Sequence, residues 1–361
     1  MKVLRRKRRL AGYTALALIL SSAAAVAAGP AQARVSVIPV VSRVVASWGD
    51  NSIGELGDGT LTTRSLYRDI AAGSDVVQVA AGRIHNLALR SDGTVSAWGI
   101  NEHGALGDGT TTDRSTPVQV SGLAGVMTQV AAGEEFSLAL RSDGTVWAWG
   151  RNDRGQLGNG APSYSPVSVP VKVAGLSQVT GISAGSDSAL AAEASGISAI
   201  TSVWAWGNND DGQLGDGTTT VHSTPERVTG LPVSIAGITV GAQFAAVLGT
   251  DGSVWSWGSN ALGQLNIAPP GSVVTRPVNV IAVGSRITQI SAGAVHMLAL
   301  RSDGTVLGWG NNQFGELGDG SPALVSGPVQ VTNLAGATQV AAGQLCSFAV
   351  HTVLVLAGQS S

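Results

Sequence analysis

The stretch VAAGEEFSLALRSDGTVWAWG, residues 130–150, decides the fold. It holds three short apolar segments, which are separated by Gly-Glu-Glu and by Ser-Asp-Gly. Gly144 in the second separator supplies the positive φ that a tight hairpin turn needs. In the last segment Trp147 and Trp149 alternate with small apolar residues, so both faces of this strand are apolar and have to be covered. The stretch therefore predicts short antiparallel strands in a sheet that is packed on both faces.

The pattern recurs about every 51 residues. Trp-Gly pairs end the third segment of each copy, at Trp48, Trp98, Trp149, Trp206, Trp257 and Trp309. Each pair begins W-G-x-N-x-x-G-x-L, and a later Pro-Val-x-Val segment supplies a fourth strand. Four-stranded sheets stacked between like sheets cover both faces of every strand, and radial closure of the stack removes its ends. The repeat predicts an all-β fold, a β-propeller of four-stranded blades. A linear solenoid is the alternative, but it would need polar capping units.

The two ends of the chain complement each other. Val44–Gly49 has the Trp-Gly strand without the Ala-Ala-Gly strand that should precede it, and Ala341–Leu356 has the Ala-Ala-Gly strand without a following Trp-Gly strand. We therefore expect six blades, in a ring closed by sharing one blade between the N- and C-terminal segments. Seven blades are the alternative, with Arg34–Val44 and the tail supplying further strands.

The N-terminus has the pattern of a targeting segment. A basic run at Lys2–Arg9 precedes an apolar run at Ala11–Ala28 and a small-x-small site at Ala31–Ala33. We expect a signal peptide at 1–33, cleaved after Ala33, and a single β-propeller domain at 34–361; an uncleaved anchor is the alternative. The expected location is extracellular or in the cell envelope of a bacterium.

Cleavage would change the charge of the chain. Six of the 21 basic residues and none of the 23 acidic residues precede Arg34, which leaves 15 basic against 23 acidic residues and a net charge of −8. Such a chain is a poor general binder of nucleic acid. Cys346 is the only cysteine, so no internal disulfide can form. We expect no nucleic-acid partner, no membrane span after cleavage and a monomer.

The repeated motifs are specific to one family. The run W-G-x-N-x-x-G-Q-L-G-D-G-T-T-T, followed by V-A-A-G-x-x-H-x-L-A-L-R-S-D-G-T-V-W-A-W-G, resembles the regulator-of-chromosome-condensation repeat family over nearly all of Arg43 to His351. The resemblance implies a propeller with interlocked first and last blades, and the best-known members have seven. Its founder is a guanine-nucleotide exchange factor docked on chromatin. Exported bacterial members include a type that looks like a protein inhibitor capping β-lactamases, which favours a protein-binding role here.

No catalytic, cofactor or metal constellation is visible in the sequence. His85 and His296 occupy one repeat position, which holds Phe136, Ser188, Phe244 and Cys346 in the other copies. A position that accepts such different residues indicates packing. The acidic stretch Asn208–Gly212 fits no D-x-[DN]-x-[DN]-G calcium register, and no phosphate-cradling G-x-x-x-x-G-K-[ST] loop is present. We therefore expect a non-enzymatic protein without cofactors.

Variable residues inside the fixed W-G-x-N-x-x-G frame are the candidate partner-binding residues. A ring would place them on one rim, where loops on a rigid scaffold carry function. They are Ile53, Glu102, His103, Asp153, Arg154, Asp210, Asp211, Leu262 and Phe314. Solvated loop tips are the alternative interpretation, and the insertion at Glu193–Ser202 is a second candidate loop. A polymer-acting lyase or hydrolase would instead use His103, Asp153, Asp210 and Asp211. An exchange-factor-like activity is the third and least favoured function.

Overall fold

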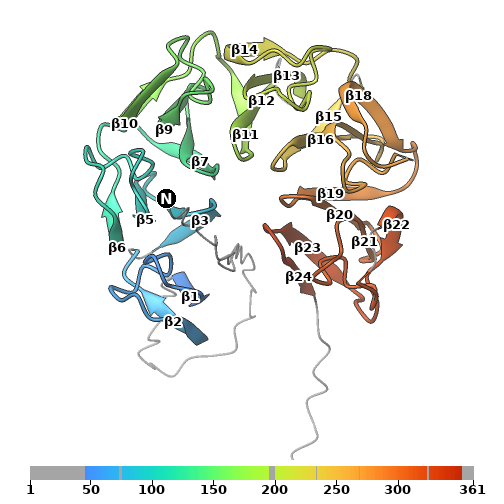
Figure 1. Ribbon diagram of the computed structural model, residues 1–361, viewed down its shortest axis with the longest axis horizontal. Coiled ribbons are helices and arrows are strands. Elements are labelled where there is room, and N and C mark those ends of the chain that lie inside the picture. The colour runs from blue at the N-terminus through green and yellow to red at the C-terminus, as the bar shows by residue number, and fades with distance from the viewer. Residues whose placement is uncertain are drawn as a thin grey trace, which may run out of the picture.

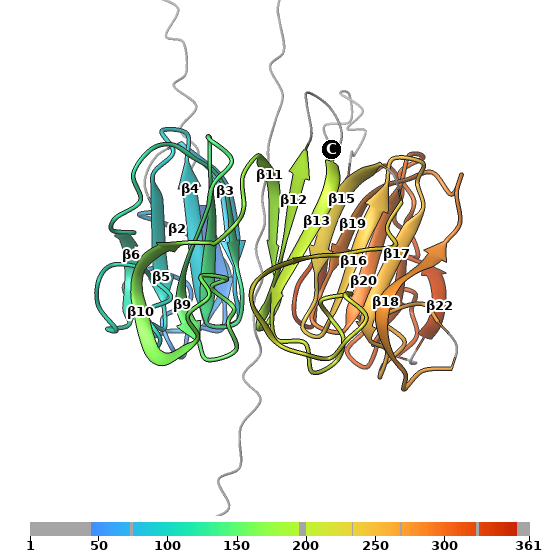
Figure 2. The same ribbon diagram turned by 90° about the horizontal axis from the view of Figure 1, so that it is seen from above.

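A computed structural model describes residues 45–72, 75–194, 200–232, 234–267, 269–322 and 325–351. These residues form 24 β-strands and no helix, so none of them lies in a helix that could cross a membrane. Figure 1 shows the strands arranged as sheets around a common centre, and Figure 2 shows them standing side by side. The expected signal peptide at 1–33 and the extra strands considered for Arg34–Val44 lie outside the described residues. So does the centre of the insertion, 195–199.

Five sets of four consecutive antiparallel strands are complete blades. The first contains β3 (Val76–Ala81), β4 (His85–Arg90), β5 (Val95–Gly99) and β6 (Arg114–Gln119). The second contains β7 (Met127–Ala132), β8 (Phe136–Arg141), β9 (Val146–Asn152) and β10 (Ser163–Lys172). The third contains β11 (Val179–Ala184), β12 (Ser188–Ala194), β13 (Ile200–Gly207) and β14 (His222–Arg227). The fourth contains β15 (Ile235–Val240), β16 (Phe244–Gly249), β17 (Val254–Ser259) and β18 (Val273–Ile281). The fifth contains β19 (Ile287–Ala292), β20 (His296–Arg301), β21 (Val306–Gly310) and β22 (Val325–Gln330).

Two half-blades complete the described structure. One pairs β1 (Val45–Gly49) with β2 (Arg64–Ile70), and the other pairs β23 (Ala337–Ala342) with β24 (Ser347–His351). They flank the opening of the ring in Figure 1, and no ladder joins β24 to β1 in the described residues. The all-β propeller of four-stranded antiparallel blades is confirmed, whereas the shared blade and the count of six remain predictions.

The local predictions for the strands and turns are confirmed. The Ala-Ala-Gly, Leu-Ala-Leu, Trp-Gly and Pro-Val-x-Val segments each form one strand of a blade. The Ser-Asp-Gly turns and the equivalent Thr250-Asp251-Gly252 turn lie between the second and third strands, and their glycines have φ of 79–81°, at Gly93, Gly144, Gly252 and Gly304. Glycine accepts this left-handed conformation without the penalty that other residues incur.

Buried tryptophans connect each complete blade to the W-G-x-N-x-x-G loop of the preceding blade or half-blade. The five Trp-Gly tryptophans from Trp98 to Trp309 are 0–2% exposed. Each indole N–H donates to a backbone carbonyl of that loop at 2.8–3.0 Å, for example from Trp149 to Ala105. The indole of Trp149 also lies on Gly107, where a Cβ would come within 2.7 Å of the ring nitrogen. The same glycine contact occurs at Trp98, Trp206 and Trp257, while the equivalent position before Trp309 is Asn266, so the W-G-x-N-x-x-G-x-L frame and the residue after it build the interfaces between blades.

Candidate functional site

The variable residues lie on one face of the propeller, which we call the loop face. It consists of the W-G-x-N-x-x-G loops and the turns that follow each Ala-Gly. The first backbone N–H after each Trp-Gly in the complete blades donates to the turn of the same blade, as Arg151 does to the Glu135 carbonyl at 2.9 Å. The Ser-Asp-Gly turns lie at the other end of the strands, on the opposite face, which we call the hairpin face (Figure 2).

An asparagine inside each loop holds its shape. The Asn209 side-chain oxygen accepts from the Leu214 N–H at 2.9 Å, and its amide donates to the Asp216 carboxylate at 3.3 Å and to the Thr220 carbonyl at 3.0 Å. Asn209 is fully buried. Equivalent bonds to the leucine N–H recur at Asn51, Asn101, Asn152, Asn260 and Asn312. The acidic stretch is therefore a hydrogen-bonded scaffold, and only Asp210 and Asp211 are particular to this copy.

Two of the candidates, His103 and Asp153, meet with charged residues of a third blade around Arg151. Its guanidinium lies 2.7 Å from Asp153, 3.2 Å from Glu135 and 3.8 Å from Asp187 of the next blade. His103 reaches the same Glu135 from the preceding blade at 3.4 Å. The structure thus brings candidates from separate repeats into one cluster, which we call the Arg151 cluster.

A second ion pair extends this cluster. Arg154 lies 3.3 Å from Asp210 of the next blade, and both side chains are about half exposed. Asp211 is adjacent to Asp210 in the same loop, and Glu102 is exposed in the preceding blade. Exposed pairs of this kind contribute little to stability, so their positions matter more for recognition than for folding.

The carboxyl groups of the cluster differ in acidity. Burial raises the pKa of Asp187, and the neighbouring Asp153 and Glu135 add to that rise against the opposing effect of Arg151. Burial also raises the pKa of Asp211, with a smaller contribution from Asp210. Burial acts to raise the pKa of Asp153 too, but the hydrogen bond and charge of Arg151 outweigh it and lower that pKa. Asp187, and Asp211 beside the cluster, are thus less well compensated than Asp153.

The other half of the loop face is apolar. Phe314 is 68% exposed at its loop tip, and Leu262 is half-buried in the neighbouring loop. The turns of this half carry Val295 and Leu345, both half-buried. Ile53, half-buried, lies in the loop of the half-blade β1–β2. The loop face is therefore divided into a charged half and an apolar half.

The turn residues were missed when the sequence was analysed. The residues after the Ala-Gly and Val-Gly landmarks include Glu134, Glu135 and Asp187 on the charged half and Ala294, Val295 and Leu345 on the apolar half, although Ile84 lies on the charged half and Gln243 and Gln344 lie on the apolar half. An alignment of the six landmarks, five of them Ala-Gly and one Val240-Gly241, would have revealed them. What it could not reveal is that turn and loop lie side by side.

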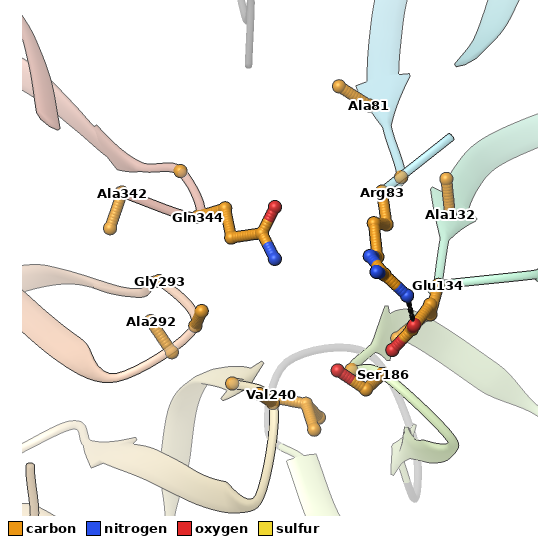
Figure 3. A pocket seen from close by; sticks show the side chains of 18 residues that line it. Ala81, Arg83, Ala132, Glu134, Ser186, Val240, Ala292, Gly293, Ala342 and Gln344 are labelled. Carbon is orange, nitrogen blue, oxygen red and sulfur yellow. Dashed lines mark ion pairs between the residues drawn. The ribbon is translucent and has the colours of Figure 1, made fainter. Parts of the chain in front are cut away.

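The turns also surround a central cavity of about 140 Å³ (Figure 3). Arg83 and Glu134 form an ion pair on one side, and Gln344 points into the cavity from the other. The Gln344 side-chain oxygen is buried without a hydrogen-bond partner among the described residues. Most residues that line the cavity are Ala and Gly, whose side chains are too small to fill it.

The histidine position is a packing site, as expected. His85 and His296 are 0–1% exposed, and each ring Nε2 is hydrogen-bonded to a serine hydroxyl of the next blade. Burial lowers both pKa values to about 4. Cys346 was expected to be buried at this position but is only half-buried, because no β1 strand pairs beside β24. Within the described ranges, no three His, Cys, Asp or Glu side chains are grouped to hold a metal ion.

Comparison with known proteins extends these observations. A family model, the RCC1-like domain, matches residues 44–358. The chain is 32% identical to the ultraviolet-B receptor UVR8 of Arabidopsis thaliana over 304 residues, which cover 82% of this chain and 67% of the receptor. It is 30% identical to the E3 ubiquitin-protein ligase HERC2 of Mus musculus over 320 residues, which cover 86% of this chain but only 6% of the ligase.

The fold is also shared with a solved structure. Prp20p of Saccharomyces cerevisiae, described with its binding properties to Gsp1p and histones, superposes with a TM-score of 0.74 at 28% identity. The match covers 86% of this chain and 78% of Prp20p. The sequence repeat, the blades with their interlocking tryptophans, and these matches agree, and the chain belongs to the RCC1-like domain family of β-propellers.

Proposed function

We propose that this chain is an exported, non-enzymatic scaffold that binds a protein partner through its loop face. The observation that carries this proposal is the sorting of variable residues on an invariant frame. Buried asparagines and tryptophans fix each loop, while the tips carry charges in three blades and apolar groups in the others. A rigid scaffold with divergent tips is the arrangement that recognition surfaces use.

Protein binding by similar propellers supports this proposal. Prp20p is described with binding to Gsp1p and histones, and a second structure of this yeast protein contains bound Kap60. We extend the proposal to an inhibitor-like role, in which the loop face caps its target. Asp153, Asp210 and Arg154 support recognition better than acid–base catalysis, because they already engage in ion pairs.

Site-specific photocrosslinking tests the proposal. A photoreactive amino acid is placed at Asp211 on the loop face, or at the exposed Asp303 on the hairpin face as the control. The full chain is then expressed in its source organism. We expect a discrete protein adduct from position 211 and none from position 303. Adducts from both positions alike, or from neither, would overturn binding through the loop face.

Export is tested on the same material. The mature protein recovered from the medium or envelope should begin at Arg34, as shown by intact mass. A cytoplasmic chain that retains residues 1–33 would contradict export without bearing on which face binds. For the inhibitor-like role, titration against a panel of purified β-lactamases should reveal saturable inhibition. Its absence at micromolar concentrations would remove that role while leaving the scaffold proposal intact.

A further inference from the structure

The loop face carries more negative than positive charge in the Arg151 cluster and its extension. The carboxylates of Glu135, Asp153, Asp187 and Asp210 lie within 3.8 Å of the guanidinium group of Arg151 or Arg154, and a fifth, that of Asp211, follows Asp210 in the same loop. Five negative and two positive charges leave an excess of three negative charges. One guanidinium serves three of these carboxylates, so the protein itself compensates them incompletely.

The same face leaves apolar side chains in water. Phe314 is 68% exposed at its loop tip. Leu262 and Val295 belong to neighbouring elements of the same half of the face and are half-buried. Exposed aromatic and aliphatic groups rimmed by polar residues are typical of protein-binding surfaces.

Charge complementarity indicates which kind of partner fits the loop face. A segment that presents only apolar groups would bury Phe314 but leave the neighbouring carboxylates to be desolvated without a partner, which is costly. A nucleic acid would add negative charge to a face that already has an excess of it. A segment with arginine or lysine beside a large apolar side chain satisfies both halves at once, because long basic side chains reach carboxylates while their neighbours pack.

We propose that the loop face binds a protein segment of this chemistry. Its basic side chains lie over Asp187 and Asp211, and its aromatic or aliphatic side chain packs against Phe314 and Leu262. The inference rests on the proposed function and names the chemistry of the partner. The partner's on-rate and affinity should both fall with salt, because its charged half is steered and held by the carboxylates.

A random peptide library displayed on phage is the probe. It is selected against the immobilised full chain, and the enriched peptides are synthesised and their affinities measured. We expect sequences that combine Arg or Lys with Phe, Trp, Leu or Ile. Their affinity should fall about tenfold or more between about 50 and about 500 mM NaCl.

Three double variants locate the binding. D187N/D211N should weaken binding about tenfold and flatten the salt dependence, because it removes charge without changing shape. L262S/F314S should weaken binding by a similar factor with the salt dependence unchanged. D92N/D303N removes the same charge from the hairpin face and should leave affinity unchanged. Urea unfolding of each variant checks that the fold is retained.

The outcomes separate the two proposals. Enriched peptides without an excess of basic residues, which still lose affinity in L262S/F314S, would overturn the proposed partner chemistry and leave binding by the loop face standing. Peptides that lose affinity in D92N/D303N and in neither loop-face variant would overturn binding by the loop face itself. Failure to enrich any peptide would count against both proposals.

Discussion

At the scale of single residues, the His or Phe side chain that follows an Ala-Gly turn has the same polarity as the residue that it contacts in the next blade. His85 Nε2 lies 2.8 Å from the Ser137 hydroxyl, and His296 Nε2 lies 3.0 Å from the Ser347 hydroxyl. Where the repeat has Phe136 instead, the serine position holds Ala189, and both are buried in one apolar cluster. The chain thus contains a polar and an apolar version of the same contact. In the polar version the histidine and the serine are 51 to 52 residues apart.

This matching makes the polar version sensitive to acid. Burial keeps His85 neutral, because it lowers the pKa from the ordinary histidine value of 6.5 to about 4 in the folded chain. Between these values the unfolded chain binds a proton that the folded chain does not, so stability falls as the pH drops from about 6.5 towards 4. At pH 4.5 the loss from one such histidine is about 2 to 3 kcal/mol.

Replacing the polar version by the apolar one should remove this sensitivity. We expect H85F/S137A to lose less stability than the unsubstituted chain between about pH 7 and about pH 4.5, by about 2 kcal/mol. Urea unfolding at the two pH values measures the difference. S137A alone keeps the histidine and is the control. Equal pH dependence in H85F/S137A and the unsubstituted chain would show that His85 does not titrate in this way.

Sequence analysis identified the histidine position but not its partner. A site that accepts His, Phe, Ser and Cys indicates packing, and the burial of His85 agrees. The serine could not be identified as its partner because it lies one repeat away. The repeat likewise showed that each of these segments ends in glycine, but it did not show why glycine is needed there. A Cβ at Gly133 would lie 2.1 Å from the Phe136 ring, so the ring excludes any side chain there.

At the scale of elements, the loop depends on a single asparagine. Asn209 makes bonds to Leu214, Asp216, Thr218 and Thr220 while fully buried. Removing it leaves the buried Leu214 N–H without its acceptor, and a buried unsatisfied donor costs about 1 to 3 kcal/mol. The loop also carries the Gln213 carbonyl that accepts from the Trp257 indole, so its distortion reaches the next blade.

We therefore expect N209A to destabilise the chain by about 3 kcal/mol, as measured by urea unfolding at neutral pH. The matched control lies two residues away. D211N changes a partly exposed side chain and leaves the bond from its backbone N–H to Gln213 in place, so the free energy of unfolding should stay within about 0.5 kcal/mol of the original. Similar losses in both variants would mean that the loop tip, and not the asparagine network, holds the loop.

The loop frame could be predicted from the sequence, and its surface could not. Six copies of W-G-x-N-x-x-G-x-L separate fixed from variable positions, which argued against a calcium site at Asn208–Gly212. The Arg151 cluster depends instead on contacts between neighbouring blades, such as Arg154 with Asp210, 56 residues away. Spacing along one repeat contains no information about such contacts.

At the scale of the whole molecule, the two ends of the described chain are complementary. Trp48 is the one Trp-Gly tryptophan that is substantially exposed, at 37%. At the other end, the hollow beside β24 has a volume of about 580 Å³ and is lined by Leu317, Gly318 and Val331. These residues repeat the surroundings of the buried indole of Trp149, which packs on Gly107 near Val120.

The hydrogen bonds repeat in the same way. The Ala105 carbonyl accepts from the Ser137 hydroxyl and from the Trp149 indole, both at 2.8 Å. The equivalent Glu316 carbonyl accepts from the Ser347 hydroxyl at 2.7 Å, and no indole reaches it in the described residues. Trp48 is the repeat equivalent of Trp149, so its indole N–H would supply the missing donor in a closed ring. We therefore expect the shared blade to form in solution, with Trp48 between Leu317 and Val331.

The register of that closure follows from the complete blades. His85 pairs with Gly99 and Ala88 with Ser96, so repeat equivalence pairs Ala349 with Ala46 across β24 and β1. In a C346S background, A46C/A349C should form an intramolecular disulfide on mild oxidation, because paired residues of adjacent strands bring their Cβ atoms within reach. S47C/A349C is the control, since a shift of one residue turns the two side chains to opposite faces.

Closure is measured by free-thiol titration and by non-reducing electrophoresis of the full chain. The A46C/A349C variant should lose both thiols and remain monomeric, and its disulfide should raise the free energy of unfolding by about 2 to 4 kcal/mol because it links the two ends of the ring. Disulfide-linked dimers as the main product would show that β1 and β24 pair between copies. Two free thiols in a folded chain would show an open ring, and either result would overturn the six-bladed closure.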